Sequence, residues 1–81
     1  MEPLKIHSTS HHPEINFDPY SGNLEISGRS LPEQVMTLYQ PILQWIEEYT
    51  STPHKNTVLK INLDYINSSS SKYLLEILKR L

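Results

Sequence analysis

The sequence predicts a mixed α/β domain of the α+β kind, with an N-terminal antiparallel hairpin, a β-α-β crossover and helices on one face of the sheet. Two short alternating runs, residues 14–17 and 23–27, flank a turn-rich segment and predict the hairpin. An apolar stripe with spacings of three and four over residues 35–49 predicts an α-helix. A further alternating run at residues 57–65 follows it, and this order predicts a right-handed crossover between two parallel strands.

The hairpin is the best-defined local element. Residues 18–22 contain Asp, Pro, Ser and Gly, each of which favours a turn for its own backbone reason. The apolar positions of the two runs then share one buried face, formed by Ile15, Phe17, Leu24 and Ile26. A short first strand is expected before the hairpin, at residues 4–7, with a polar connector between them.

The first helix has a start signal and an interruption. Ser30 and Glu33 match a capping box, in which the serine accepts from a backbone N–H and the glutamate reaches back. Pro32 would then lie in the first turn, where its missing N–H is no loss. Pro41 interrupts the stripe, but the apolar pattern continues in phase beyond it. We therefore expect one kinked helix rather than two helices.

The last strand and helix follow a second pair of patterns. On the strand, Leu59, Ile61, Leu63 and Tyr65 alternate with polar residues and are expected on the face that the helices cover. On the final helix, three leucines are expected in line on the apolar side: Leu74, Leu78 and Leu81.

Composition excludes several classes of function. The chain has 81 residues, enough for one domain, and a net charge of −2. Its basic residues are dispersed, which argues against nucleic-acid binding. It has no cysteine, so disulfides and thiolate chemistry are excluded. We find neither a signal peptide nor an apolar run of membrane-spanning length, and we interpret the chain as a soluble cytoplasmic protein without a membrane partner.

The segment most informative about function lies between the last strand and the last helix. Asn67 is followed by four consecutive serines, Ser68 to Ser71, and then by Lys72. The first N–H groups of a helix lack partners within it, so this end carries partial positive charge and accommodates an anion. A serine here can cap the helix. If phosphorylated, it places about −1.5 to −2 charges there.

Two enzymatic alternatives find little support. The four histidines, His7, His11, His12 and His54, leave a metal-dependent enzyme open, but they lack metal-ligand spacing and cysteine partners, so no metal is predicted. The serine run lacks a Gly-x-Ser-x-Gly elbow, and no Gly-rich phosphate loop is present. We therefore expect a protein that is not an enzyme and needs no cofactor.

The aromatic residues are interpreted mainly as core. Tyr39, Trp45 and Tyr49 lie on the stripe of the first helix and are expected to pack against the sheet. For Tyr73 two positions remain open: it lies either beside the serines as a surface contact or over the edge of the sheet.

Three blocks of the sequence, taken together, resemble a known family. They are the hairpin and helix start at residues 18–33, the helical stretch at residues 39–49, and the strand-to-helix junction at residues 63–72. In order and content they resemble the SiaC family of regulatory phosphoproteins. At the junction this family typically has Tyr, an apolar residue, Asn, Thr or Ser, and then two serines, which resembles the run from Tyr65 to Ser70 here.

The resemblance implies a fold and a partner switch. The fold would be the STAS-like mixed sheet of anti-sigma-factor antagonists. A serine/threonine kinase would phosphorylate one hydroxyl at the junction, and a PP2C-type phosphatase would remove the phosphate. The unmodified form would bind and activate a diguanylate cyclase, which makes cyclic di-GMP and promotes biofilm formation. The alternative is a STAS-like protein-interaction module that is never phosphorylated.

The resemblance also assigns roles at the junction. Aligning Asn67 with the asparagine of the family makes Ser68 the phosphoacceptor, or Ser69 if the register shifts by one. Asn67, Ser69 and Ser70 would shape the surface that kinase and partner bind, and Lys72 would pair with the phosphate.

Relatives in the family usually continue past this helix with a further strand and helix. The resemblance therefore implies that residues 1–81 form a single STAS-like domain that is shortened or a fragment, equivalent to the N-terminal part of the family domain. An uncovered sheet edge and an apolar helix face would favour a homodimer through that edge or through the C-terminal helix.

Overall fold

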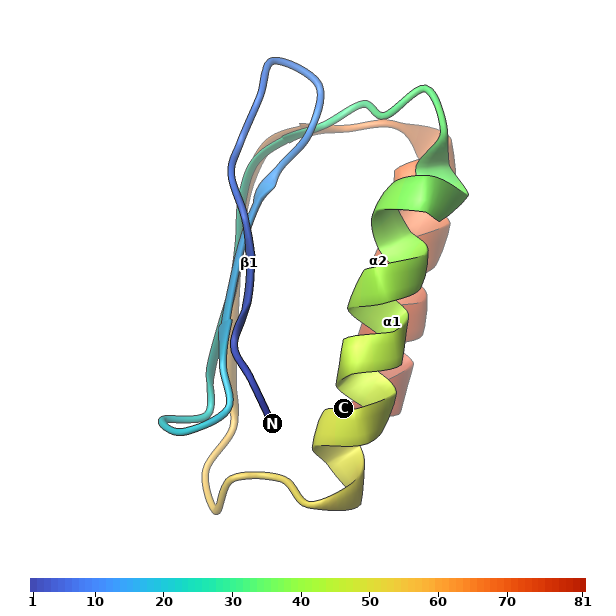
Figure 1. The fold of residues 1–81 in the computed structure, drawn as a ribbon. Coiled ribbons are helices and arrows are strands. Elements are labelled where there is room, and N and C mark those ends of the chain that lie inside the picture. Colours follow the sequence, from blue (N-terminus) through green and yellow to red (C-terminus); the bar gives the residue numbers. More distant parts are fainter.

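The computed structural model describes all residues, 1–81, as one four-stranded sheet with two helices. The elements are β1 (Leu4–Ile6), β2 (Glu14–Asp18), β3 (Asn23–Ser30), α1 (Val35–Ser51), β4 (Val58–Ile66) and α2 (Ser68–Arg80). Both helices lie on the same face of the sheet, and the other face is uncovered (Figure 1). The predicted fold class is confirmed. Neither helix is both long and apolar enough to cross a lipid bilayer.

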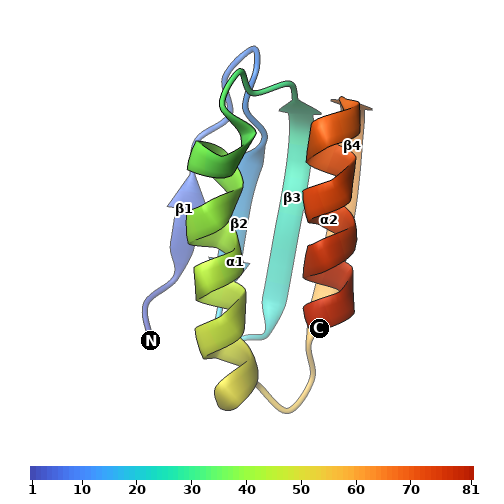
Figure 2. The same cartoon turned by 90° about the vertical axis from the view of Figure 1, so that its right-hand side faces the viewer.

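The strands follow the order β1-β2-β3-β4. The first three are antiparallel neighbours, and β4 is parallel to β3 through the crossover helix α1, as predicted. Figure 2, which looks onto the helices, shows α1 over β1 and β2 and α2 over β3 and β4. β4 is an edge strand, since it pairs only with β3.

The core lies between the hairpin and α1. Ile15, Phe17, Leu24 and Ile26 are all buried, which confirms the predicted hairpin face. α1 contributes six of the eleven core residues: Leu38, Tyr39, Ile42, Trp45, Ile46 and Tyr49. α1 is one continuous helix through Pro41, as expected from the phase of its stripe.

The predicted capping box is wrong. α1 begins at Val35, its N-cap is Gln34, and no side chain caps it. Ser30 instead ends β3 and is fully buried. Side chains in a strand alternate, so the inward phase of Leu24 and Ile26 carries on to Ser30 and overrides the local helix-start motif.

The predicted inner face of β4 is correct for Leu59 and Leu63, which pack against the core, and wrong for Tyr65. Ile61 pairs with the inward-facing Ile26 but is 38% exposed. Gly28 pairs with Leu63 but Arg29 pairs with Tyr65, so Asp64 is an extra residue in the strand. A β-bulge of this kind breaks the alternation. Tyr65 therefore lies beside Arg29 with 53% of its surface exposed, and Ile66 pairs with the buried Ser30.

The apolar stripe predicted for α2 is also corrected. Ser70 and Ile77 are the buried residues, and Tyr73 and Leu74 pack on the core beside them. These positions have helical spacing and define the inner side of the helix. Leu78 and Leu81, predicted to share this side with Leu74, are exposed. The inner side of α2 thus includes the buried Ser70 and excludes Leu78 and Leu81.

Candidate functional site

The serine-rich junction is fixed to the end of β3 by the backbone. The N–H of Asn67 donates to the carbonyl oxygen of Ser30 at 3.0 Å, which continues the β3–β4 pairing by one bond. The carbonyl of Asn67 then accepts from the N–H of Ser71 at 3.0 Å, the first turn of α2. Backbone hydrogen bonds alone therefore fix Asn67, to β3 on one side and to the first turn of α2 on the other.

Asn67 caps α2. Its backbone is extended, with φ −83° and ψ 169°, and its side-chain Oδ1 accepts from the N–H of Ser70 at 2.9 Å. The same Oδ1 accepts from the hydroxyl of Ser69 at 3.3 Å. The cap is therefore the asparagine and not one of the serines, although both residue types are favoured at this position.

Ser70 belongs to the interior. Its Oγ accepts from Ser30 Oγ at 2.9 Å, and Ser30 Oγ is also 2.7 Å from the hydroxyl of Tyr39. Both serines are 0% exposed, so the three hydroxyls form a buried network joining β3, α1 and α2. Ser70 was predicted to contribute to the partner-binding surface, but the structure does not place its side chain on any surface.

Ser68 is the first residue of α2, and its side chain is exposed. Its carbonyl accepts from Ser71 Oγ at 2.7 Å, but its own Oγ takes part in none of the hydrogen bonds of the protein. Ser69 is also exposed, with its hydroxyl directed at the cap. Of the four serines, Ser68 thus presents the hydroxyl with the fewest competing contacts.

Lys72 lies one turn after Ser68 on the same side of the helix, since the two are four residues apart. It is exposed and makes no ion pair. The salt bridges of the chain join Arg80 to Glu47 and to Glu76, at the far end of α2. Lys72 is therefore available to a phosphate on Ser68 or to an acidic partner.

The positions of the aromatic residues are settled by their contacts. Tyr39, Trp45 and Tyr49 are buried, as predicted. Tyr73 is half-buried and stacks on Tyr39, with ring centroids 5.3 Å apart and planes 19° apart. Neither of its two predicted positions is fully correct. Tyr73 packs against the core on Tyr39, the residue whose hydroxyl contacts Ser30.

Sequence reasoning missed Ser30 and Tyr39 as parts of this site. A signal was present, because Ser30 has the inward phase of Leu24 and Ile26 on the same strand. The competing capping motif concealed it. The partnership with Ser70, 40 residues away, had no local signal.

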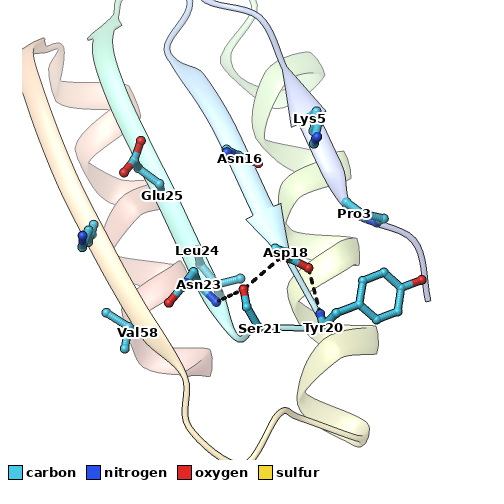
Figure 3. A pocket seen from close by; sticks show the side chains of 11 residues that line it. Pro3, Lys5, Asn16, Asp18, Tyr20, Ser21, Asn23, Leu24, Glu25 and Val58 are labelled. Atoms are coloured by element: carbon cyan, nitrogen blue, oxygen red, sulfur yellow. Dashed lines mark hydrogen bonds between the residues drawn. The ribbon is translucent and has the colours of Figure 1, made fainter.

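A polar hollow of about 490 Å³ is one of several on the remaining surface. It lies on the uncovered face of the sheet and includes the β2–β3 turn, at the opposite end of the molecule from the serine junction (Figures 1 and 3). Within it, Asp18 Oδ1 accepts from the N–H of Tyr20 and its Oδ2 from the Ser21 hydroxyl. These bonds, that of the Tyr20 N–H most strongly, lower the pKa of Asp18. They stabilise the turn and bring no second catalytic group to it.

The histidines do not converge. No three side chains among His, Asp and Glu come together in a group that could hold a metal ion. His11 Nδ1 bonds to the neighbouring Ser10 hydroxyl, and His54 Nδ1 bonds within its own loop to Asn56. The histidines therefore form no metal site with neighbouring carboxylates.

The serine junction lies within a stretch of the chain that matches a known protein family. The chain matches the profile of the SiaC family of regulatory phosphoproteins over residues 6–81. It belongs to the SiaC family. The match includes the hairpin, the crossover and the whole serine junction, so the resemblance noted in the sequence is confirmed.

The solved structure of apo-SiaC from Pseudomonas aeruginosa superposes on the chain with a TM-score of 0.93 at 31% identity, covering 99% of this chain. A structure of the diguanylate cyclase SiaD in complex with its activator SiaC, from the same organism, matches with a TM-score of 0.88 at 32% identity over 94% of this chain. An uncharacterised protein of Pseudomonas aeruginosa (strain UCBPP-PA14) is 32% identical over 78 residues.

The chain spans about two thirds of the length of these relatives. It covers 62% of the uncharacterised protein, 66% of the apo-SiaC chain and 62% of the SiaC chain matched in the complex.

Proposed function

We propose that this protein is a partner switch in cyclic di-GMP signalling that controls biofilm formation. The unmodified form binds and activates a diguanylate cyclase, and phosphorylation of Ser68 blocks that binding. The observation that carries the proposal is the exposed, unbonded hydroxyl of Ser68 at the first position of α2, in a chain that belongs to the SiaC family.

The partner is proposed from the solved relative. SiaC of Pseudomonas aeruginosa is described as the activator of SiaD and has been solved bound to it, and its structure matches 94% of the residues of this chain. The family description, regulatory phosphoprotein, supports control by phosphate.

The local geometry favours Ser68 over Ser69 and Ser70 as phosphoacceptor. Modifying Ser70 would require opening the buried network with Ser30 and Tyr39. Modifying Ser69 would remove a hydroxyl that supports the Asn67 cap. A phosphate on Ser68 disturbs neither, and it meets the positive end of the helix dipole, which stabilises an anion by about 0.3–1 kcal/mol.

The switch therefore acts on docking and not on folding. About −1.5 to −2 added charges leave the domain intact but change the surface that the partner meets. Asn67 and Ser69 shape that surface, Lys72 contributes a positive charge, and Ser70 acts from beneath by holding the first turn in place.

The further parts of the switch follow from the same proposal. A serine/threonine kinase adds the phosphate and a PP2C-type phosphatase removes it. The protein itself is not an enzyme and acts in the cytoplasm, where the kinase has ATP. Self-association through the free edge of β4 or through α2 is proposed as a property of this chain, because β4 pairs only with β3.

A second candidate function is an interaction module that is never phosphorylated. The structural roles of Asn67, Ser70 and Ser71 favour it, because they explain much of the polar run as cap and network. Mass spectrometry of intact protein and peptides, on material purified from the native host with phosphatases inhibited, separates the two. We expect phosphate on Ser68. Unmodified serines across several growth conditions would favour the second candidate.

A further inference from the structure

The solvent side of α2 carries a stripe of exposed residues that extends beyond those of the serine switch. We define the outer face of α2 as Ser68, Lys72, Leu75 and Lys79, which are all exposed. Their spacings of four, three and four place them on one side of the helix, opposite the buried Ser70 and Ile77. In Figure 2 this side of α2 is turned toward the viewer.

The apolar part of this face is Leu75, which is 57% exposed. Leu78 extends it along one flank and is 47% exposed. A leucine with this exposure contributes little to folding, but it provides an apolar anchor once a partner removes its surface from water.

The charge of the face is purely positive. Lys72 and Lys79 lie one turn on either side of Leu75, and neither makes an ion pair. Glu76 is the single acidic residue of α2, and it bonds to Arg80 at 3.2 Å on the flank toward α1. In a chain with a net charge of −2, this is a local concentration of unpaired positive charge around an apolar centre.

We propose that the outer face of α2 is the docking surface for an acidic, amphipathic segment of the cyclase, with Leu75 as its anchor and Lys72 and Lys79 as its charge contacts. The partner segment carries carboxylates on both sides of an apolar residue. The inference rests on the proposed function for the identity of its partner, and it adds Leu75 and Lys79 to the residues that bind.

On this surface a phosphate on Ser68 would weaken partner binding in two ways. Ser68 and Lys72 are four residues apart, with the acidic group nearer the helix N-terminus, which is the favourable order for an ion pair on a helix. A phosphate on Ser68 therefore pairs with Lys72 and removes it from the partner. It also brings negative charge to the end of a surface that binds carboxylates.

Binding is tested with SiaD of Pseudomonas aeruginosa as the probe, by titration calorimetry with this chain at two salt concentrations. Leu75→Ala is expected to weaken binding about tenfold, and Lys72→Gln and Lys79→Gln several-fold each with a smaller salt dependence. The matched controls are Met36→Ala, an apolar residue of α1 that is 60% exposed, and Lys55→Gln in the loop before β4. Both controls should bind like the unmodified chain.

If the chain binds SiaD and the three α2 variants bind equally well, the docking surface is wrong while the switch stands. If the chain itself does not bind SiaD, the proposed activation of this cyclase and the docking of its segment are both refuted. The pairing with phosphate is decided separately, by ³¹P NMR titration of the chain carrying phosphoserine at position 68. Lys72→Gln should raise the second pKa of the phosphate by roughly 0.3. An unchanged pKa would refute the pairing.

Discussion

Ser30 Oγ and Ser70 Oγ lie 2.9 Å apart in the interior of the protein, although 40 residues separate them in the sequence. Ser30 ends β3 and Ser70 lies in the first turn of α2, so this bond fixes the first turn of α2 to the centre of the sheet. Tyr39 adds a connection to α1 through the same hydroxyl of Ser30. Of the four serines of the run, Ser68 and Ser69 are exposed, Ser71 is partly buried and Ser70 belongs to the core.

Ser70→Ala is predicted to destabilise the protein by about 1–2 kcal/mol, because a buried hydrogen bond is lost and Ser30 keeps only its bond to Tyr39. Ser69→Ala is the matched control, since its exposed hydroxyl makes one long bond of 3.3 Å, and it should change the free energy of unfolding by less than about 0.5 kcal/mol. Urea unfolding followed by circular dichroism measures both. Equal effects of the two variants would contradict the buried network.

Gly22→Ala is predicted to be far more damaging than Gly28→Ala. Both glycines have positive φ, +77° and +98°, so each substitution strains the backbone by about 1–2 kcal/mol. At Gly22 a Cβ would additionally clash with the carbonyl oxygen of Asn56, whereas at Gly28 the nearest atom is 3.9 Å away. Thermal unfolding of the two variants tests this difference, and a Gly22→Ala protein as stable as Gly28→Ala would refute the close packing of the two loops.

Asp18 is predicted to make the stability depend on pH in the acid range. Its pKa is lowered from 3.8 chiefly by the N–H of Tyr20 and then by the Ser21 hydroxyl, so the native state favours the carboxylate. A lowered folded-state pKa contributes stability that is complete above the unfolded-state pKa and is lost as the pH falls through the folded-state value. Asp18→Asn keeps the shape of the turn without the charge.

The comparison of this variant with the unmodified chain, by urea unfolding from neutral to strongly acidic pH, measures the effect. The advantage of the unmodified chain should be constant near neutrality and should shrink below about pH 4. An advantage that grows toward acid pH would show that the turn does not favour the carboxylate.

β4 is predicted to mediate self-association at high protein concentration. It is a nine-residue edge strand, and Ile61 on its inner face is 38% exposed. Ile61→Lys places a charge on this edge and should keep the protein monomeric, whereas Lys60→Gln, on the outer face, should not. Sedimentation velocity over a range of concentrations tests this, and an unmodified chain that stays monomeric throughout would contradict it.

The parts of the fold that were predictable are those fixed by short-range patterns. Alternation around residues 18–22 determined the hairpin, and the helical stripe crossing Pro41 determined α1. Each pattern reports which side of one element is apolar, and burial then follows from it.

The errors all occurred where a distant partner decided the outcome. Ser30 has a local motif for helix capping, but the strand phase and the hydroxyl of Ser70 keep it in the sheet. Tyr65 alternates correctly in the sequence, but the bulge at Asp64 turns it outward. At the site, the sequence singled out the serine run but did not distinguish exposed Ser68 from buried Ser70, because this depends on how α2 is rotated against the core.

The central claim is that one phosphate on Ser68 separates the protein from its cyclase. The most direct measurement is the affinity of the diguanylate cyclase for the chain carrying phosphoserine at position 68, compared with the unmodified chain, with each form confirmed by intact mass. We predict that the unmodified chain binds and that the phosphate weakens binding at least tenfold, about 1.4 kcal/mol, while the fold is unchanged. Equal affinity of the two forms would contradict the account.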